Sequence, residues 1–429
     1  MGAMNPSELG KRYDDAIVRL EEAAGARLAG TLGSAEHVDE RVARQVIGEL
    51  VGRIGGLGGE GDEVLEAIAN AAFDDLYRLG PLEELLEDTR FTEIMVNAPD
   101  DVRVEMDGVI YRTDAHFRDD DHVLGVCTRL AVDDDRHCDK ATPICDCTLH
   151  RRGASFDGSR VNLTIPPVAV DHPLIDIRKF RQDVLTPKAL IDLGTMDERC
   201  GDLLEALVLA RMNIIVIGGT GSGKTTTLNV ISSYIPDSQR IATIEDTVEL
   251  KLAKDQVIRH QTRQRSIEGT GEITIHDLVK NSLRERPDRI VVGECRDGAA
   301  FEMLQAMSTG HDGSLATIHA NNARDALSRL QMMVQMSDAA GNMNPESIMR
   351  VITSAVDIIV DVRRWPDGHR RIAEVVEVCG MEGDTPTLEP LIGYDEASDS
   401  WISRGARLTP GHRARFRTNG VPVNEGWWS

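Results

Sequence analysis

Apolar residues in the first part of the chain recur at the spacing of an amphipathic helix. Between residues 36 and 55 they lie three or four positions apart on one stripe, and the glycine-rich run GGLGGEG then ends the pattern. A second stripe of this kind runs from Leu65 to Leu79. Because such a stripe buries one face of a helix against a neighbour, residues 1–80 are predicted to form a helical segment.

From about residue 90 the spacing of apolar positions changes to two, which is typical of half-buried strands. The Asp–Gly pair at residues 107 and 108 stands between two alternating runs, where a tight hairpin turn favours these residue types. Residues 122–132 predict a helix, and the runs GSRVNLTIPPV and PLIDIRKF predict two further strands. We therefore expect a small α+β domain over residues 81–185.

The apolar runs beyond residue 185 are apolar at consecutive positions and alternate with helical segments. Strands of this kind are buried on both faces, as in a parallel sheet that helices cover on each side. The pattern predicts an α/β domain over residues 186–385, followed by a C-terminal tail over residues 386–429 that is basic and loop-like from about residue 395. The predicted strands are NIIVIG (213–218), RIATIE (240–245), RIVVGE (289–294), SLATIH (314–319) and DIIVDV (357–362).

The net charge of −23 argues against a generic nucleic-acid binder, which needs a basic surface, and against direct docking on an anionic membrane. No run reaches the roughly 18 apolar residues of a membrane span, and the N-terminus lacks the apolar core of an export signal. We therefore expect a cytoplasmic protein that reaches the inner face of the cytoplasmic membrane only through protein partners.

Seven cysteines without a CxxC pair indicate a reducing compartment rather than a disulfide framework. One local cluster, HCDKATPICDCTLH, runs from His137 to His150. Ordinary thiols are the expected reading, because zinc sites usually pair their cysteines two to four residues apart, and a metal site is the alternative.

The sequence GGTGSGKT fits the phosphate-binding pattern G-x-x-x-x-G-K-[ST] and lies directly between a predicted strand and a predicted helix. Glycines let backbone N–H groups surround phosphates, and the helix presents its positive end to them. Lys224 is expected to reach the β- and γ-phosphates of ATP, and Thr225 to place its hydroxyl on Mg²⁺. The expected nucleotide-binding residues are Gly218, Gly219, Thr220, Gly221, Ser222, Gly223, Lys224, Thr225 and Thr226.

Hydrolysis also requires a group that orients water, and Glu294 supplies a carboxylate at the end of the run RIVVGE. Gly293 stands where an aspartate is commoner. Mg²⁺ is therefore expected to be held by Thr225, the phosphates and water, with help from Glu245 or Glu249 in the stretch TIEDTVEL.

Four motifs occur in a fixed order, namely GGTGSGKTTTLN, TIEDTVEL, LRERPDRIVVGECR and STGHDGSLATIHAN. This set resembles the secretion ATPase superfamily of type II and type IV systems, most closely the CpaF/TadA branch of tight-adherence (Flp) pilus assembly. The resemblance covers about residues 80–380 and implies a RecA-like P-loop ATPase domain after a smaller N-terminal α+β domain. The second and fourth motifs correspond to the family's Asp box and His box. The resemblance thus implies that Glu245, His311 and His319 lie near the nucleotide, where the histidines report the γ-phosphate.

The same resemblance points to four arginines. GSRVN and IRKF match segments of the family's N-terminal domain, which implies that Arg160 and Arg178 approach the phosphates from that side. Arg259 and Arg263 follow the Asp box and are candidates for reaching across a subunit boundary. Arginine suits this role because its charge is permanent and its hydrogen bonds are bidentate.

The chain departs from the family pattern in two places. GECRDGAA stands where relatives usually read GEVRGGEA, so that Asp297 replaces a glycine and Ala299 a glutamate. An acidic role at residue 299 is therefore not expected. The zinc-binding cysteine module of many type II ATPases is absent from the sequence, which favours the CpaF/TadA branch.

The resemblance implies a homo-hexameric ring that hydrolyses ATP and moves an inner-membrane platform protein, so that pilin subunits are assembled or exported. A ring couples hydrolysis to subunit movement when one chain's phosphate loop meets another chain's arginines. Two alternatives are a type IV traffic ATPase that moves DNA or effector proteins and a nucleotide-gated scaffold without turnover. The absence of a basic patch around the core argues against DNA.

Overall fold

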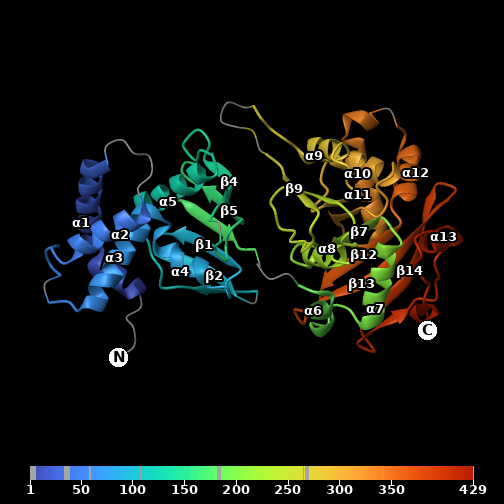
Figure 1. The fold of residues 1–429 in the computed structure, drawn as a ribbon, viewed down its shortest axis with the longest axis horizontal. Coiled ribbons are helices and arrows are strands. Elements are labelled where there is room, and N and C mark those ends of the chain that lie inside the picture. The colour runs from blue at the N-terminus through green and yellow to red at the C-terminus, as the bar shows by residue number, and fades with distance from the viewer. Residues whose placement is uncertain are drawn as a thin grey trace. The chain divides into compact units, whose positions relative to one another are not determined.

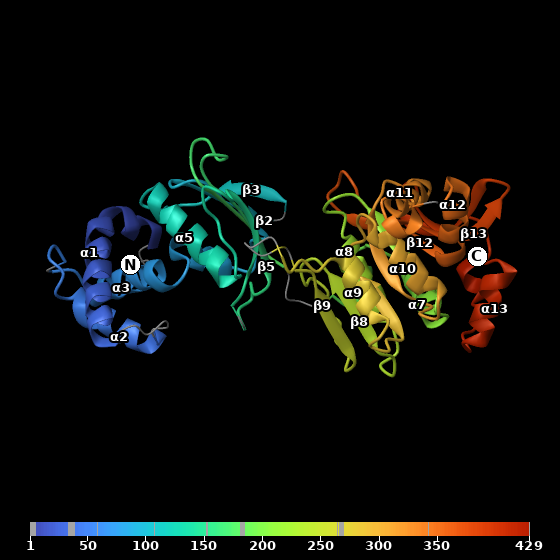
Figure 2. The ribbon, with the colours of Figure 1, turned by 90° about the horizontal axis from the view of Figure 1, so that it is seen from above.

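The computed structural model describes residues 6–32, 39–57, 59–106, 108–151, 153–180, 185–263, 265, 270–341 and 343–428. The chain divides into two compact units, residues 1–182 and 183–429. Figures 1 and 2 show the elements of each unit from two directions. Among the residues that the structure describes, no helix is both long enough and apolar enough to span a membrane.

The first unit begins with three helices that pack on one another. They are α1 (Pro6–Leu32), α2 (Glu40–Val51) and α3 (Asp62–Tyr77). Their apolar stripes meet in a core that includes Leu20, Ile47 and Phe73. The expected helical segment is confirmed, and α1 is a further helix that the apolar spacing did not single out.

The rest of the first unit is an antiparallel sheet of six strands in the order β3-β2-β1-β6-β5-β4. Helix α5 buries Val123, Val126 and Leu130 against this sheet, as the α+β pattern predicts. Strands β2 and β3 form the expected hairpin, since Met106 pairs with Val109, while Asp107 of the predicted turn lies outside the described residues. The elements are η1 (Gly80–Leu82), α4 (Glu83–Glu87), β1 (Glu93–Ala98), β2 (Asp101–Met106), β3 (Val109–Arg112), α5 (Asp120–Asp133), β4 (Ile144–Leu149), β5 (Ser159–Thr164) and β6 (Leu174–Arg178).

Strand β4 lies inside the cysteine and histidine cluster and was not predicted. Cys145 and Cys147 point from it into the same core as α5. Among the described residues, no group of histidine, cysteine or acidic side chains is arranged to hold a metal ion. The packing accounts for Cys145 and Cys147 as apolar side chains, and the reading of the cluster as ordinary thiols rather than a metal site stays a prediction.

The second unit is built on a nine-stranded sheet in the order β15-β14-β13-β12-β7-β11-β10-β8-β9. The six strands from β12 to β9 are parallel, and all five predicted strands are among them. Helices cover both faces, because Ile215 and Ile217 of β7 belong to one core and Ile214 and Val216 to another. The predicted parallel α/β sheet is confirmed.

The elements of the second unit follow in chain order. They are α6 (Pro187–Asp192), α7 (Glu198–Leu209), β7 (Ile214–Gly218), α8 (Lys224–Ser232), β8 (Ile241–Glu245), β9 (Val257–Gln261), α9 (Ile275–Ser282), β10 (Arg289–Val292), α10 (Ala299–Ser308), β11 (Leu315–His319), α11 (Ala323–Gln335), η2 (Asp338–Ala340), α12 (Pro345–Ala355), β12 (Ile358–Arg364), β13 (Arg370–Glu382), β14 (Thr385–Asp395), β15 (Ser400–Ser403), α13 (Pro410–Thr418) and η3 (Glu425–Trp428).

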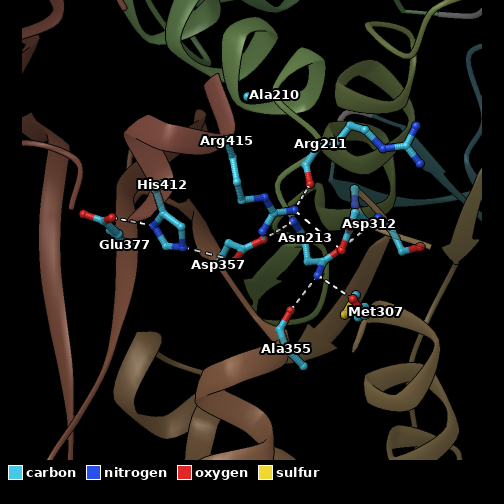
Figure 3. Close-up of polar contacts among 12 residues, drawn as sticks. Ala210, Arg211, Asn213, Met307, Asp312, Ala355, Asp357, Glu377, His412 and Arg415 are labelled. Carbon is cyan, nitrogen blue, oxygen red and sulfur yellow. Dashed lines mark hydrogen bonds and ion pairs between the residues drawn. The ribbon is translucent and has the colours of Figure 1, made fainter. Parts of the chain in front are cut away.

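The residues after 385 are structured, and the expectation of a loop-like tail is wrong. Strands β14 and β15 extend the sheet in antiparallel order. Helix α13 is fixed to it by His412, which contacts Asp357 and Glu377 (Figure 3). Although this part of the chain is basic, its aromatic residues Trp401 and Phe416 are buried in the same core as α7.

Candidate nucleotide-binding site

The phosphate loop runs from the buried strand β7 to helix α8, and its backbone requires glycine at two positions. A Cβ atom at Gly218 would lie 2.1 Å from the carbonyl oxygen of Val362 on β12. Gly223, the N-cap of α8, has a φ of +97° in the left-handed region and gives the helix no side-chain cap. The first N–H groups of α8 therefore lack a side-chain oxygen from their N-cap, which is the arrangement that favours phosphate binding.

Lys224 is the first residue of α8 and is nearly buried, at 8% exposed. Its Nζ donates a hydrogen bond to the carbonyl oxygen of Gly219 at 2.8 Å, across the loop. The buried Ser222 Oγ has no hydrogen-bond partner among the described residues. An ammonium group and an unpaired hydroxyl inside a loop of backbone N–H groups fit the phosphates of a nucleotide.

His319 reaches the same loop from the neighbouring strand. The register of β11 and β7 pairs His319 with Gly218, and His319 Nδ1 lies 3.4 Å from Lys224 Nζ. On its other side, His319 Nε2 lies 3.0 Å from Glu294 Oε1. Burial and the charge of Lys224 lower the pKa of His319, so the ring is neutral at pH 7. A neutral ring fits both contacts when Nδ1 accepts from the lysine and Nε2 donates to the carboxylate.

Glu294 follows β10 and is held as a carboxylate. Burial alone would raise its pKa, but the hydrogen bond from Arg296 and the charges of Arg296 and Lys224 hold the pKa of Glu294 below its ordinary value. Arg296 Nη2 donates to Glu294 Oε2 at 2.6 Å and Arg296 Nη1 lies 3.7 Å from Asp246. The structure thus joins Lys224, His319, Glu294 and Arg296 in one chain of contacts beside the phosphate loop.

Glu245, at the end of β8, explains the glycine before Glu294. A Cβ atom at Gly293 would lie 2.8 Å from Glu245 Cγ, so an aspartate there has no room unless Glu245 moves. Glu245 Oε1 accepts hydrogen bonds from the backbone N–H groups of Glu249 and Leu250, both at 2.9 Å. Burial raises the pKa of Glu245 to about 7 in spite of these bonds.

The expected metal-binding residues lie on two connected segments. Thr225 is in the first turn of α8, and Glu249 is in the stretch after β8. Lys251 N–H donates to Asn229 Oδ1 of α8 at 3.0 Å, so the two segments are joined directly. A hydroxyl and a carboxylate are oxygen ligands of the kind that Mg²⁺ prefers, and the residues present fit this ion.

His311 does not lie at this site. It precedes β11, whereas His319 ends it, and β11 runs parallel to β7. The loop around His311 lies at the opposite edge of the sheet, where Asn213 Oδ1 accepts from the backbone N–H of Gly313 at 2.7 Å and of Ser314 at 3.1 Å (Figure 3 shows Asn213). The five residues of β11 span about 16 Å. The strand therefore separates His311 from the phosphate loop of its own chain, and the expectation that His311 lies near a nucleotide stays a prediction.

The predicted arginines lie on two different units. Arg160 and Arg178 pair across β5 and β6 in the first unit, and Arg178 Nε lies 4.0 Å from Glu93. Arg259 is an exposed residue of the edge strand β9, and Arg263 follows that strand. A role of these four residues at a phosphate or across a subunit boundary stays a prediction.

Two further arginines contact the site and were not predicted. Arg296 stands two residues after Glu294 in the quoted motif, so its proximity could have been inferred from spacing. Arg370 begins β13, and its Nε donates to the carbonyl oxygen of Gly221 at 2.9 Å. Nothing in the local sequence indicates this contact, because it depends on the β12–β13 hairpin folding back beside the loop.

Comparison with known proteins identifies the family. The family model described as type II/IV secretion system protein matches residues 75–367. A putative conjugal transfer protein of Mycobacterium tuberculosis is 33% identical over 323 residues, which cover 75% of this chain and 91% of that protein. The type IV secretion system protein VirB11 of Bartonella quintana is 28% identical over 335 residues, or 70% of this chain and 92% of that protein.

A solved structure agrees with the fold. The pilus retraction motor PilT with bound ADP superposes with a TM-score of 0.53 at 22% identity and covers 78% of this chain and 84% of that one. The RecA-like domain after a smaller N-terminal domain is thus confirmed, whereas the assignment to the CpaF/TadA branch stays a prediction. The chain belongs to the family of type II/IV secretion system proteins, as its four ordered motifs predicted.

Proposed function

We propose that this chain is an ATP hydrolase that powers a type II/IV secretion machine. The observation that supports this most is the chain of contacts from Lys224 through His319 and Glu294 to Arg296, because it joins the phosphate loop to a charged carboxylate at a neighbouring strand end. Phosphoryl transfer depends on positioning and charge rather than on covalent chemistry, and this arrangement supplies both.

In the proposed mechanism Lys224 exchanges the Gly219 carbonyl for the β- and γ-phosphates of ATP, and the N–H groups of the loop hold the same oxygens. Thr225, and Glu249 through water, would hold Mg²⁺. When bound, the ion neutralises phosphate charge. Glu294, charged at neutral pH, orients and activates the attacking water.

His319 is the group through which hydrolysis is sensed. It lies between the phosphate-binding lysine and Glu294, so a change in either partner alters its hydrogen bonds. Since its pKa is lowered, it exchanges partners as a neutral ring without taking up a proton.

Steady-state phosphate release and nucleotide binding test the proposal. Glu294→Gln should lower the rate of phosphate release at least a hundredfold while ATP binding remains. Lys224→Ala should lose both ATP binding and phosphate release. Phosphate release by Glu294→Gln at the wild-type rate would refute the role of Glu294. Binding without any turnover by the wild-type protein, alone and with its membrane partners, would favour the scaffold.

At the finer level we propose the motor of a tight-adherence pilus, acting as a homo-hexamer on an inner-membrane platform protein at the cytoplasmic face. The motif resemblance to the CpaF/TadA branch and the net charge of −23 support a protein cargo. Conjugal transfer is the second candidate, because relatives such as the probable conjugal transfer protein TrbB of Sinorhizobium fredii carry that name, at 33% identity over 298 residues, 68% of this chain and 85% of that protein. Salt-sensitive retention of the purified protein on DNA would favour conjugal transfer.

A further inference from the structure

The first unit contains a cavity of about 210 Å³ that has no part in the proposed hydrolysis. It lies between α1, α3, η1 and residues 115–122, within one compact unit. Ile17, Ile68 and Pro81 give it apolar walls. Five carboxylates also line it, and they are Asp14, Asp74, Asp75, Glu83 and Glu84.

Two of these carboxylates have close cationic partners. Asp75 accepts from Arg118 Nη1 at 2.8 Å and lies 3.3 Å from His122 Nε2. Glu83 accepts from Arg151. The charges of Asp75 and Glu83 are therefore neutralised inside the protein by Arg118 and Arg151.

Asp14 and Asp74 are different, because within the described residues neither side chain accepts a hydrogen bond. His116 Nε2 lies 3.9 Å from Asp14 and Arg78 Nη1 lies 3.8 Å from Asp74, both beyond hydrogen-bond distance. Asp74 Oδ1 is buried without a hydrogen-bond partner, and so is Nδ1 of His116, whose side chain is 8% exposed and lines the cavity. Burial, followed by the charge of Glu83, raises the pKa of Asp74 to about 7, and burial also raises the pKa of Asp14.

We propose that this cavity binds an alkylammonium group, with its charge paired to Asp14 and Asp74 and its methylene groups against Ile17 and Ile68. Buried polar atoms without partners are rare in proteins, and a carboxylate out of water is stabilised by a cation that can also donate hydrogen bonds. The apolar walls select an organic cation over a hydrated metal ion. The group belongs either to a free aliphatic diamine or to a lysine side chain of a partner protein, which share this chemistry.

Calorimetric titration of the full chain with putrescine at 0.15 M salt and pH 7.5 tests the proposal. The neutral analogue 1,4-butanediol tests the need for charge, and Nα-acetyl-lysine amide represents a partner's lysine. Asp74→Asn and Asp14→Asn remove one charge each and keep the shape of the side chain. Asp192→Asn is the matched control, because this exposed acid on α6 contacts only Lys188 among the described residues.

We expect one saturable site that is at least tenfold weaker in Asp74→Asn and in Asp14→Asn, unchanged in the control, and undetectable with butanediol. Because protonation of Asp74 competes with the ammonium, the affinity for putrescine should fall about tenfold from pH 8 to pH 6. Tighter binding of the lysine amide than of putrescine would assign the site to a partner protein, and the reverse to a free amine.

Equal weakening in the control would show diffuse attraction to an acidic chain and would overturn the proposal, as would binding of butanediol or unchanged affinity in both aspartate variants. The variants should fold, since the raised pKa of Asp74 means that its charge opposes folding above neutral pH. Asp14 is also 35% exposed and tolerates an amide, so at least one variant remains informative.

Discussion

His412 joins two buried acids at the sheet edge opposite the phosphate loop, and we expect His412→Gln to destabilise the second unit in a pH-dependent way (Figure 3). Its Nδ1 lies 2.5 Å from Glu377, which is fully buried, and its Nε2 lies 3.1 Å from Asp357, which is 5% exposed. Both ring nitrogens face carboxylates, so the charged imidazolium, which donates from both, is the form that the site favours.

The size of the effect follows from the pKa. Burial alone would lower the pKa of His412, but the hydrogen bonds and charges of Asp357 and Glu377 raise it from 6.5 to about 9. A pKa that is higher in the folded state adds stability that is fully present below pH 6.5 and is lost as the pH rises through 9. The roughly 2.5-unit difference corresponds to about 3 kcal/mol of unfolding free energy at low pH and about 2 kcal/mol at pH 7.5.

Urea unfolding followed by tryptophan fluorescence measures this quantity directly, because all four tryptophans of the chain belong to the second unit. The free energy of unfolding of His412→Gln should be about 3 kcal/mol below wild type at pH 6, and most of this difference should vanish at pH 9.5. His369→Gln, at an exposed position of the same unit, is the matched control and should change little. A deficit of the same size at both pH values would refute the charged imidazolium as its cause.

Three further predictions concern the phosphate loop and its neighbours. Gly293→Asp should lower the free energy of unfolding by about 1–3 kcal/mol in the same urea assay, because its Cβ meets Glu245 Cγ. Adding Glu245→Ala should restore part of this loss, and no restoration would show that the strain lies elsewhere. Arg370→Gln removes the guanidinium that donates to the Gly221 carbonyl, so the KM for ATP should rise about fivefold or more with a smaller change in kcat. Arg370→Lys should restore little of the KM because the contact uses Nε of arginine. An unchanged KM in Arg370→Gln would show that the contact does not shape the loop. Lys224→Arg keeps the charge but is longer in a nearly buried position, so nucleotide binding measured by fluorescence titration should fall at least tenfold; wild-type affinity would show that charge alone suffices.

The parts of the fold that sequence predicted are those with a local signal. The central strands are apolar on both faces, and this pattern identifies buried parallel strands without knowledge of their neighbours, as in Ile214–Gly218. Strand β4 alternates as a half-buried strand does, with Cys145, Cys147 and Leu149 buried, but it was missed because two of these three residues are cysteines rather than the β-branched and aromatic residues that are enriched in strands. Strands β14 and β15 were missed although each pairs with the strand before it in the chain, β13 and β14. Their position is fixed by packing far along the sequence, since Trp401 of β15 belongs to the same core as α7.

The same distinction separates the two histidines of the fourth motif. Both stand in one short stretch, and their spacing of eight residues gives no indication of which edge of the sheet each occupies. The register that pairs His319 with Gly218 decides it, because the strand between the histidines has the length needed to place them at opposite edges. His319 then lies between Lys224 and Glu294, whereas the loop of His311 adjoins Asn213. The sequence motif therefore predicts which residue types form this site, but only the parallel register of β7 and β11 shows which of these residues contact one another.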